Sequence, residues 1–155
     1  MKNGLKLTLC ILVPLLVGSL GAIATSSSIN TWYLSLNKPS FNPPNYLFGP
    51  VWTCLYVLMG ISFFIILNSK NEIPKKRAII IFTIQLFLNF IWSFIFFYFQ
   101  LLSLAFIEIF LLWLFILGMI AEFYKISKVA ALLNTPYLLW VSFASVLNGT
   151  IWYLN

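Results

Sequence analysis

Few side chains that commonly carry out catalysis occur in this sequence, and most of them lie inside long apolar runs. Histidine is absent, which removes histidine metal ligands, Ser-His-Asp triads and Cys-His dyads. Cys10 and Cys54 sit apart in separate apolar runs and form no disulfide framework. Glu72 and Glu122 belong to polar connections and have no hydrolytic spacing. We therefore predict no metal site, no conventional catalytic residue and no obligatory cofactor.

Aromatic and amide side chains at helical spacing are the better candidates. Spacings of three and four place several of them on one helix face in each of two runs: Gln85, Asn89, Trp92 and Phe96 in the first, and Tyr137, Trp140, Ala144 and Asn148 in the second. Trp52 and Tyr56 have the same relationship in a third run. Polar groups within a membrane usually face the bundle interior, and aromatic walls with a few polar groups are typical of small-molecule sites. We predict a cavity for flat, apolar ligands, lined by Trp52, Tyr56, Asn89, Trp92, Trp140, Ala144 and Asn148.

Other interpretations of individual residues stay open at this level. Gln85 can simply bond a neighbouring helix, as amides in membrane spans often do. Trp32, Trp152 and Tyr153 also fit a belt of aromatic residues at the membrane surface. Glu108 is the only formal charge deep within an apolar run. It is either a protonated structural group or a ligand or proton site.

The elements that position these residues are membrane-spanning helices. Hydrophobic residues make up 62% of the chain, charged residues 8%, and the mean hydropathy is +1.00. Such a composition favours the bilayer as solvent, in which a spanning helix needs about 20 mostly apolar residues. Five segments qualify, approximately residues 5–24, 50–67, 78–98, 102–123 and 129–154. The predicted fold class is an all-α membrane protein, in which residues 1–155 form a single domain, a five-helix bundle with a long ordered loop between the first two helices.

Basic residues predict the orientation. Eight lie in the N-terminal segment or in the second and fourth connections: Lys2, Lys6, Lys70, Lys75, Lys76, Arg77, Lys125 and Lys128. With five spans they all fall on one side, and Lys38 alone falls on the other. Positive loops are cytoplasmic, so we expect the N-terminus inside and both the long loop and the C-terminus outside. Because these charges lie between apolar runs, they predict no nucleic-acid partner.

The loop "WYLSLNKPSFNPPNYLFGPVW", residues 32–52, is unusual in holding four of the seven prolines and six aromatic residues. Long loops without secondary structure are usually functional or disordered, and aromatic content argues against disorder. We predict a lid over the cavity in which Trp32, Tyr33 and Phe41 cover the ligand. Prolines restrict its backbone. Lys38 meets a ligand carboxylate in one interpretation and is a solvated surface charge in the other.

Three stretches of the sequence resemble the TspO/MBR family of tryptophan-rich sensory proteins and translocator proteins. In the loop, the matching residues are Trp32, Tyr33, Leu36, Lys38, Pro39, Phe41, Pro43, Pro44, Pro50 and Trp52. In "QLFLNFIWSFIFF" they are Gln85, Leu88, Asn89, Trp92, Ser93 and Phe97, and in "PYLLWVSFASVLN" Pro136, Tyr137, Trp140, Phe143, Ala144, Leu147 and Asn148. Glu108 falls where the family often has an acidic residue.

The resemblance implies a five-helix bundle, commonly a homodimer, in a bacterial cell membrane, with a ligand pocket beneath the first loop. Porphyrins such as protoporphyrin IX and isoquinoline or benzodiazepine compounds are the implied ligands. The pocket would then use Trp32, Tyr33, Lys38, Pro39, Phe41, Pro43, Pro44, Glu108 and Phe143 besides the residues predicted above. Animal members end the fifth helix with a cholesterol-recognition pattern, a Leu or Val, then a Tyr, then a Lys or Arg. Here Leu147 and Tyr153 are present, but no basic residue follows them before Asn155. High-affinity cholesterol binding is therefore not expected.

Three functions are compatible with these features. The first is a membrane receptor or carrier for tetrapyrroles, with a role in their transport or in stress sensing. The second is a light-dependent porphyrin-degrading enzyme with Trp52 and Trp140 as its reactive residues. The third is a scaffold acting through helix contacts, for which the small residues Gly18, Gly21 and Ala22 permit close packing within the chain or in a dimer.

Overall fold

A computed structural model describes residues 3–155 of the chain; Lys2, counted above among the basic residues, lies outside them. The described residues form helices and connecting segments, with no strand among them. The long elements are α1 (Asn3–Ser28), α3 (Phe48–Asn68), α4 (Lys76–Ser93), α5 (Leu102–Ile126) and α7 (Thr135–Leu154). Shorter elements are α2 (Trp32–Ser35), η1 (Asn45–Leu47), the π-helical turn η2 (Phe94–Tyr98) and α6 (Lys128–Leu132). The predicted fold class is confirmed.

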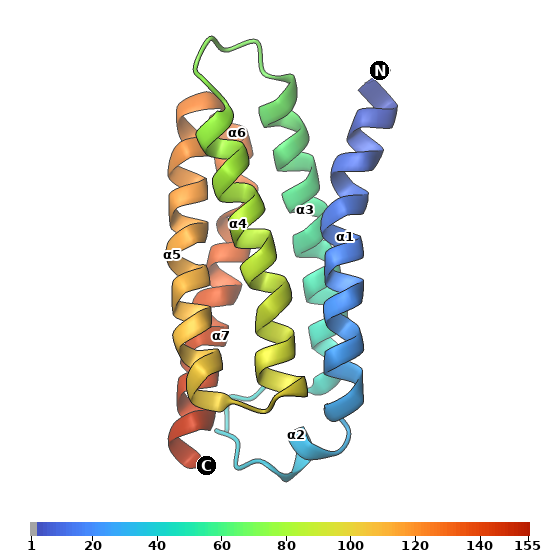
Figure 1. Cartoon of the computed structure of the whole chain (residues 1–155), viewed down its shortest axis with the longest axis vertical. Coiled ribbons are helices and arrows are strands. Elements are labelled where there is room, and N and C mark those ends of the chain that lie inside the picture. Colours follow the sequence, from blue (N-terminus) through green and yellow to red (C-terminus); the bar gives the residue numbers. More distant parts are fainter. Residues whose placement is uncertain (1–2) are drawn as a thin grey trace.

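The long helices run side by side along the long axis of the molecule, and the two chain ends lie at opposite ends of it (Figure 1). Helix α1 packs against α3 and α4, α4 against α5, α5 against α6 and α7, and α6 against α3. Five helical segments of this bundle are long and apolar enough to cross a membrane. Together with the comparisons reported below, this makes the protein an integral, multi-pass membrane protein.

Glycines allow α1 and α3 to approach each other closely. A Cβ atom built on Gly60 would lie 2.5 Å from the Cα of Ile11 and 2.6 Å from the carbonyl oxygen of Cys10, so the two backbones are in direct contact there. Gly18 faces the ring of Tyr56, and a Cβ at Gly21 would lie 3.2 Å from Oγ of Ser93 on α4. The glycines at 18 and 21 therefore sit at contacts within the chain.

One of the predicted spans is divided in the structure. The span expected over 129–154 is divided into α6 and α7 by a turn, because Pro136 in the first turn of α7 donates no backbone hydrogen bond. The Asn134 side chain at this turn donates to Oγ of Ser62 at 2.6 Å and to the carbonyl of Ala130 at 2.9 Å. At the other end of the bundle, a short turn joins η2 to α5, with Gln100 at φ 57°.

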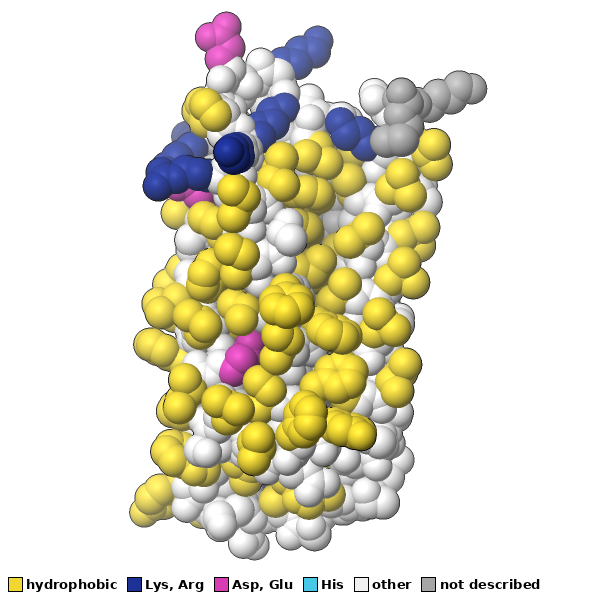
Figure 2. All heavy atoms as spheres, in the orientation of Figure 1, with side chains coloured by type: hydrophobic (Ala, Val, Ile, Leu, Met, Phe, Trp, Pro, Cys, Tyr) yellow, Lys and Arg dark blue, Asp and Glu magenta, His cyan; other side chains and the backbone are white. Residues whose placement is uncertain are grey.

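Charged side chains gather at the end of the bundle that carries the N-terminus, and hydrophobic side chains cover much of the middle of the face shown (Figure 2). At that end Lys6 donates to Oδ1 of Asn68 at 2.7 Å, and Lys75 donates to the carbonyls of Leu67 and Ser69 at 3.1 and 2.6 Å. These carbonyls belong to the C-terminal end of α3, where cations are favourable. The long loop, which includes α2, lies at the opposite end (Figure 1).

A candidate ligand cavity beneath the long loop

The long loop is fixed to the bundle through Tyr33, whose side chain is 2% exposed. Its ring packs against Phe96 and Phe97, with centroid distances of 6.1 and 5.7 Å. Its hydroxyl donates to Oδ1 of Asn42 at 2.7 Å and so connects the two halves of the loop. Burial raises the pKa of Tyr33 to about 12, so the hydroxyl stays a donor throughout the physiological range.

Lys38 stabilises the loop from within. Its ammonium donates to the carbonyl oxygens of Tyr33, Leu34 and Leu36 at 2.7, 3.2 and 2.9 Å. These carbonyls end the short helix α2, which has too few residues to satisfy them internally. The ammonium also lies 5.1 Å from the centre of the Tyr33 ring. The structure therefore gives Lys38 a structural role, which neither sequence-based interpretation included.

A third attachment joins the loop to the end of α7. The backbone N–H of Asn37 donates to Oδ1 of Asn155 at 3.0 Å, and Nδ2 of Asn155 donates to the Asn37 carbonyl at 2.9 Å. This reciprocal pair satisfies backbone groups that no sheet or helix pairs. Together with Tyr33 and Lys38, it holds the middle of the loop in place.

Aromatic rings of the loop cover the end of the bundle. Trp32 meets Phe96 edge to face at a centroid distance of 5.8 Å, and Phe41 meets Phe143 at 6.3 Å. Phe48, at the start of α3, meets Trp140 at 6.2 Å. Rings in this arrangement are stabilised beyond the area they bury. The predicted covering position of the loop is thus present in the structure.

A cavity of about 360 Å³ lies beneath the loop, within the range typical of small-molecule sites. Five elements supply most of its wall: α1, α3, α4 with η2, α5 and α7. Eight of the residues predicted for a site line it, namely Tyr33, Trp52, Tyr56, Asn89, Trp92, Trp140, Ala144 and Asn148. Gly18 and Ala22, predicted to pack helices, also line it.

The other predicted residues lie outside the lining. They are Trp32, Lys38, Pro39, Phe41, Pro43, Pro44, Glu108 and Phe143. Trp32, Phe41 and Phe143 belong to the aromatic cover above the cavity. Glu108 is 8% exposed, on the face of α5 that also buries Ala105 and Leu112, and its carboxyl oxygens have no hydrogen-bond partner among the described residues.

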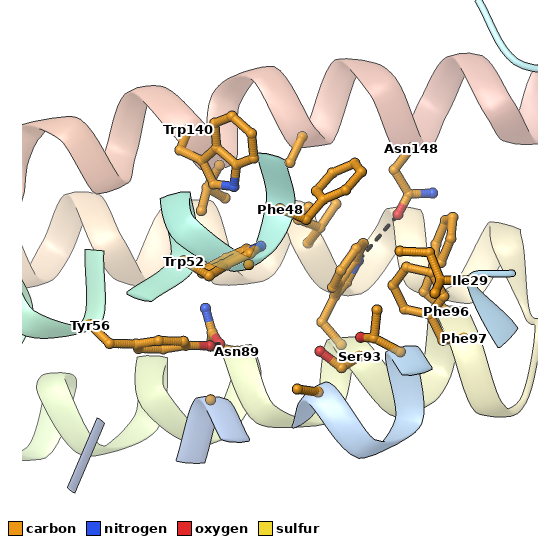
Figure 3. Close-up of a pocket in the computed structure, with 18 of the residues that line it drawn as sticks. Ile29, Phe48, Trp52, Tyr56, Asn89, Ser93, Phe96, Phe97, Trp140 and Asn148 are labelled. Atoms are coloured by element: carbon orange, nitrogen blue, oxygen red, sulfur yellow. Dashed lines mark hydrogen bonds between the residues drawn. The ribbon is translucent and has the colours of Figure 1, made fainter. Parts of the chain in front are cut away.

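Several aromatic rings face the cavity (Figure 3). Trp52 from α3 stacks on Tyr56 at a centroid distance of 5.6 Å, and Trp140 approaches from α7 on the opposite side. Trp92 donates from Nε1 to Oδ1 of Asn148 at 3.2 Å, which fixes its indole between two helices. The Nε1 donor of Trp140 is buried and has no partner among the described residues. This indole N–H is therefore an unsatisfied donor in the cavity wall.

A chain of hydrogen bonds, here called the polar ladder, lies at the floor of the cavity. Its members are Tyr56, Asn89, Tyr137, Gln85 and Met59 from α3, α4 and α7. Tyr56 donates to Asn89 at 2.5 Å, Asn89 to the Tyr137 hydroxyl at 2.9 Å, Tyr137 to Gln85 at 3.0 Å, and Gln85 to the Met59 sulfur at 3.4 Å. The ladder satisfies polar groups that lipid would leave unpaired, and it closes the cavity on the side of the basic end.

Some lining residues were not predicted from the sequence. Ile109 and Leu112 of α5 contribute apolar wall, as do Phe48 and Phe97. Nothing distinguishes Ile109 and Leu112 from the lipid-facing residues around them in the sequence. The face of α1 that includes Gly18, Ala22 and Ser26 has a clear four-residue spacing. For Gly18 and Ala22 this spacing predicts helix packing, and it does not by itself indicate the wall of a cavity.

The chemistry available in the cavity is recognition of an apolar, flat molecule. Its few polar groups are amides, hydroxyls and indole N–H groups, and no charged side chain lines it. Among residues 3–155, no three His, Cys, Asp or Glu side chains come together as metal ligands. Aromatic stacking and one or two hydrogen bonds are the interactions this wall offers.

Comparison with known proteins relates this architecture to a family. The model of the TspO/MBR family matches residues 10–154. The chain belongs to the TspO/MBR family. It is 45% identical to the tryptophan-rich protein TspO of Chlorobaculum tepidum over 157 residues, which cover 99% of this chain and 98% of the relative. It is 42% identical to the protein of the same name from Archaeoglobus fulgidus, with 99% of both chains covered.

Similarity extends to animal members of the TspO/MBR family. The human translocator protein is 32% identical over 146 residues, which cover 90% of this chain and 86% of the human protein. The matched region of the family includes the long loop, the polar ladder and the cavity walls. The resemblance drawn from the three sequence motifs is confirmed.

Proposed function

We propose that this TspO/MBR protein is a membrane receptor or carrier that binds porphyrins such as protoporphyrin IX in the cavity beneath the long loop. The observation that carries the proposal is the cavity wall, in which Trp52, Trp92 and Trp140 face one space of about 360 Å³. Flat macrocycles stack on such rings and lose apolar surface to them. Isoquinoline and benzodiazepine compounds share this flat, apolar chemistry and would compete for the same space.

The proposed physiological role is transport or sensing of tetrapyrroles at a bacterial cell membrane. The basic end of the bundle would face the cytoplasm and the long loop the outside, because positive residues concentrate at the end opposite the loop (Figure 2). A ligand in this cavity would sit in the outer half of the membrane, separated from the cytoplasmic side by the polar ladder.

Tryptophan substitutions test the binding proposal. Trp52→Ala and Trp140→Ala each remove a ring from the wall, and we expect each to weaken protoporphyrin IX binding at least about tenfold, the scale of losing a buried aromatic anchor. The control is Trp152→Ala, because Trp152 is 48% exposed and does not line the cavity. Porphyrin titrations on protein in phosphatidylcholine nanodiscs give the affinities. Unchanged affinity in both folded cavity variants would refute the assignment.

A second candidate function is light-dependent oxidation of the bound porphyrin by dioxygen. The observation that favours it is that two indoles, Trp52 and Trp140, face the same ligand space. Illuminated porphyrin should then disappear faster with protein than in empty nanodiscs and give one defined product. The Trp52→Phe and Trp140→Phe variants should lose this product while they still bind. Identical bleaching with and without protein would exclude the enzyme.

A further inference from the structure

Five residues line the cavity and are also exposed on the outer surface of the bundle. They are Ser19, Ala22 and Ser26 on α1, and Gly49 and Thr53 on α3. A residue that faces an internal space and the exterior at the same time must lie at an opening. These five residues, here called the rim, come from two neighbouring helices that pack against each other.

We infer that the cavity opens sideways between α1 and α3, and that apolar ligands enter through this opening from the lipid rather than through the loop. The inference rests on the proposed function and specifies the route to the same cavity. The rim lies in the loop-side half of the bundle, since it occupies the C-terminal half of α1 and the first turns of α3 (Figure 1). The ligand would therefore come from the leaflet on the loop side.

The packing of α1 and α3 explains why the opening lies where it does. Toward the basic end, Gly60 brings the backbones of the two helices into contact, so no gap exists there. Gly18 then accommodates the ring of Tyr56, which forms the inner edge of the opening. Beyond Gly18, the two helices face each other with rim residues that carry small side chains or none. Such side chains are too short to fill the space between the helices.

The chemistry of the rim suits passage of an apolar molecule. Each hydroxyl of the rim donates back to its own helix: Ser19 to the Leu15 carbonyl at 2.8 Å, Ser26 to that of Ile23 at 3.0 Å, and Thr53 to that of Gly49 at 2.9 Å. No hydroxyl donor is left to bind water or to retain a polar solute. The rim also carries no charged side chain.

The other routes into the cavity are obstructed. The loop is held by Tyr33, by the Lys38 ammonium and by the Asn37–Asn155 pair, and its rings cover the end of the bundle. The polar ladder closes the opposite side, where opening would leave amides and hydroxyls unpaired in the membrane. Passage through the sideways opening requires none of these hydrogen bonds to break.

Bulky rim substitutions test the entrance with protoporphyrin IX as probe. We expect the double variant Ala22→Phe/Thr53→Phe, in phosphatidylcholine liposomes, to bind and release porphyrin each at least about fivefold more slowly. An obstruction of the entrance slows both directions, so the association and dissociation rates should fall together. Gly49→Leu is a milder second variant, since a Cβ at Gly49 meets no atom within 4 Å. Stopped-flow porphyrin fluorescence gives the association rate. The dissociation rate is measured in the same way after an excess of an isoquinoline carboxamide displaces the bound porphyrin.

The matched control is Ile23→Phe/Cys54→Phe, which alters the neighbouring exposed positions that do not line the cavity. Rates in both rim variants equal to those of the control would overturn the sideways entrance. A loss of affinity with an unchanged association rate would also overturn it, because the rim would then belong to the binding site itself. Absence of porphyrin binding by the wild-type protein would instead refute the proposed function.

Discussion

The hydroxyl of Tyr56 lies 2.5 Å from Oδ1 of Asn89, while its ring stacks on Trp52 and faces the cavity. One side chain therefore belongs both to the cavity wall and to the polar ladder that joins α3 to α4 and α7. The ring and the hydroxyl can be separated experimentally, because phenylalanine keeps the first and removes the second.

Tyr56→Phe should lower the free energy of unfolding by about 1 kcal/mol, since interhelical hydrogen bonds in membranes contribute about 0.6 to 1.7 kcal/mol. Porphyrin affinity should stay close to that of the wild type, because the stacking ring is retained. Denaturant unfolding in detergent micelles measures the change, and Tyr153→Phe, at a residue 87% exposed, is the control. A stability loss no larger than in that control would contradict the ladder's role.

Gly60→Ala should destabilise the protein by about 1 to 3 kcal/mol, the cost of overpacking a close contact. The added methyl group would meet backbone atoms of Cys10 and Ile11, which have no rotamer to change. Gly118→Ala is the matched comparison, because a Cβ there meets only Ile81 at 4.0 Å. It should leave the thermal midpoint unchanged or raise it, as alanine favours a helix. Equal midpoints for the two variants would be the contrary result.

Trp140→Phe should weaken protoporphyrin IX binding by about 1 kcal/mol, roughly fivefold, if a ligand acceptor takes the free indole N–H. It should not lower stability, because that donor has no partner in the protein. Trp113→Phe should lower stability and leave the porphyrin affinity unchanged. Nε1 of Trp113 donates to Oγ of Ser142 at 2.7 Å, and Trp113 does not line the cavity. Affinity titrations and unfolding curves on both variants give the comparison. Unaltered affinity in Trp140→Phe would exclude this hydrogen bond.

Lys38→Met should increase amide hydrogen exchange across residues 32–45, because three carbonyl acceptors lose their donor. It should change the affinity for protoporphyrin IX and for its dimethyl ester to the same small extent. Hydrogen-exchange mass spectrometry and parallel titrations measure both. A loss confined to the free acid would show instead that Lys38 pairs with a ligand carboxylate.

The fold was predictable because lipid imposes a simple rule on this chain. Apolar length gave the five spans, and alternating spacings of three and four residues placed Trp52, Asn89, Trp140 and Asn148 on inward faces. Pro136 is a signal in the sequence for the break between α6 and α7.

Features that depend on how distant parts of the chain pack together could not be predicted from the spacing of residues. The role of Lys38 follows from where three carbonyls happen to converge, which no periodicity describes. The contribution of Ile109 and Leu112 depends on which face of a uniformly apolar helix turns inward. The sideways opening similarly follows from the difference between the contact at Gly60 and the small residues of the rim.

The hydrogen bonds of Lys38 also affect long-range attraction. Its positive charge is directed into the carbonyl dipoles of α2, while the other cations of the described residues gather at the far end of the bundle. An anionic molecule arriving at the loop end of the bundle thus meets little attractive field there, and electrostatic steering contributes little to its capture. On the proposed route from the lipid, the solubility of the ligand in the membrane would then set how often the cavity is filled. That solubility depends on the lipid composition and on the number of ionised groups on the ligand.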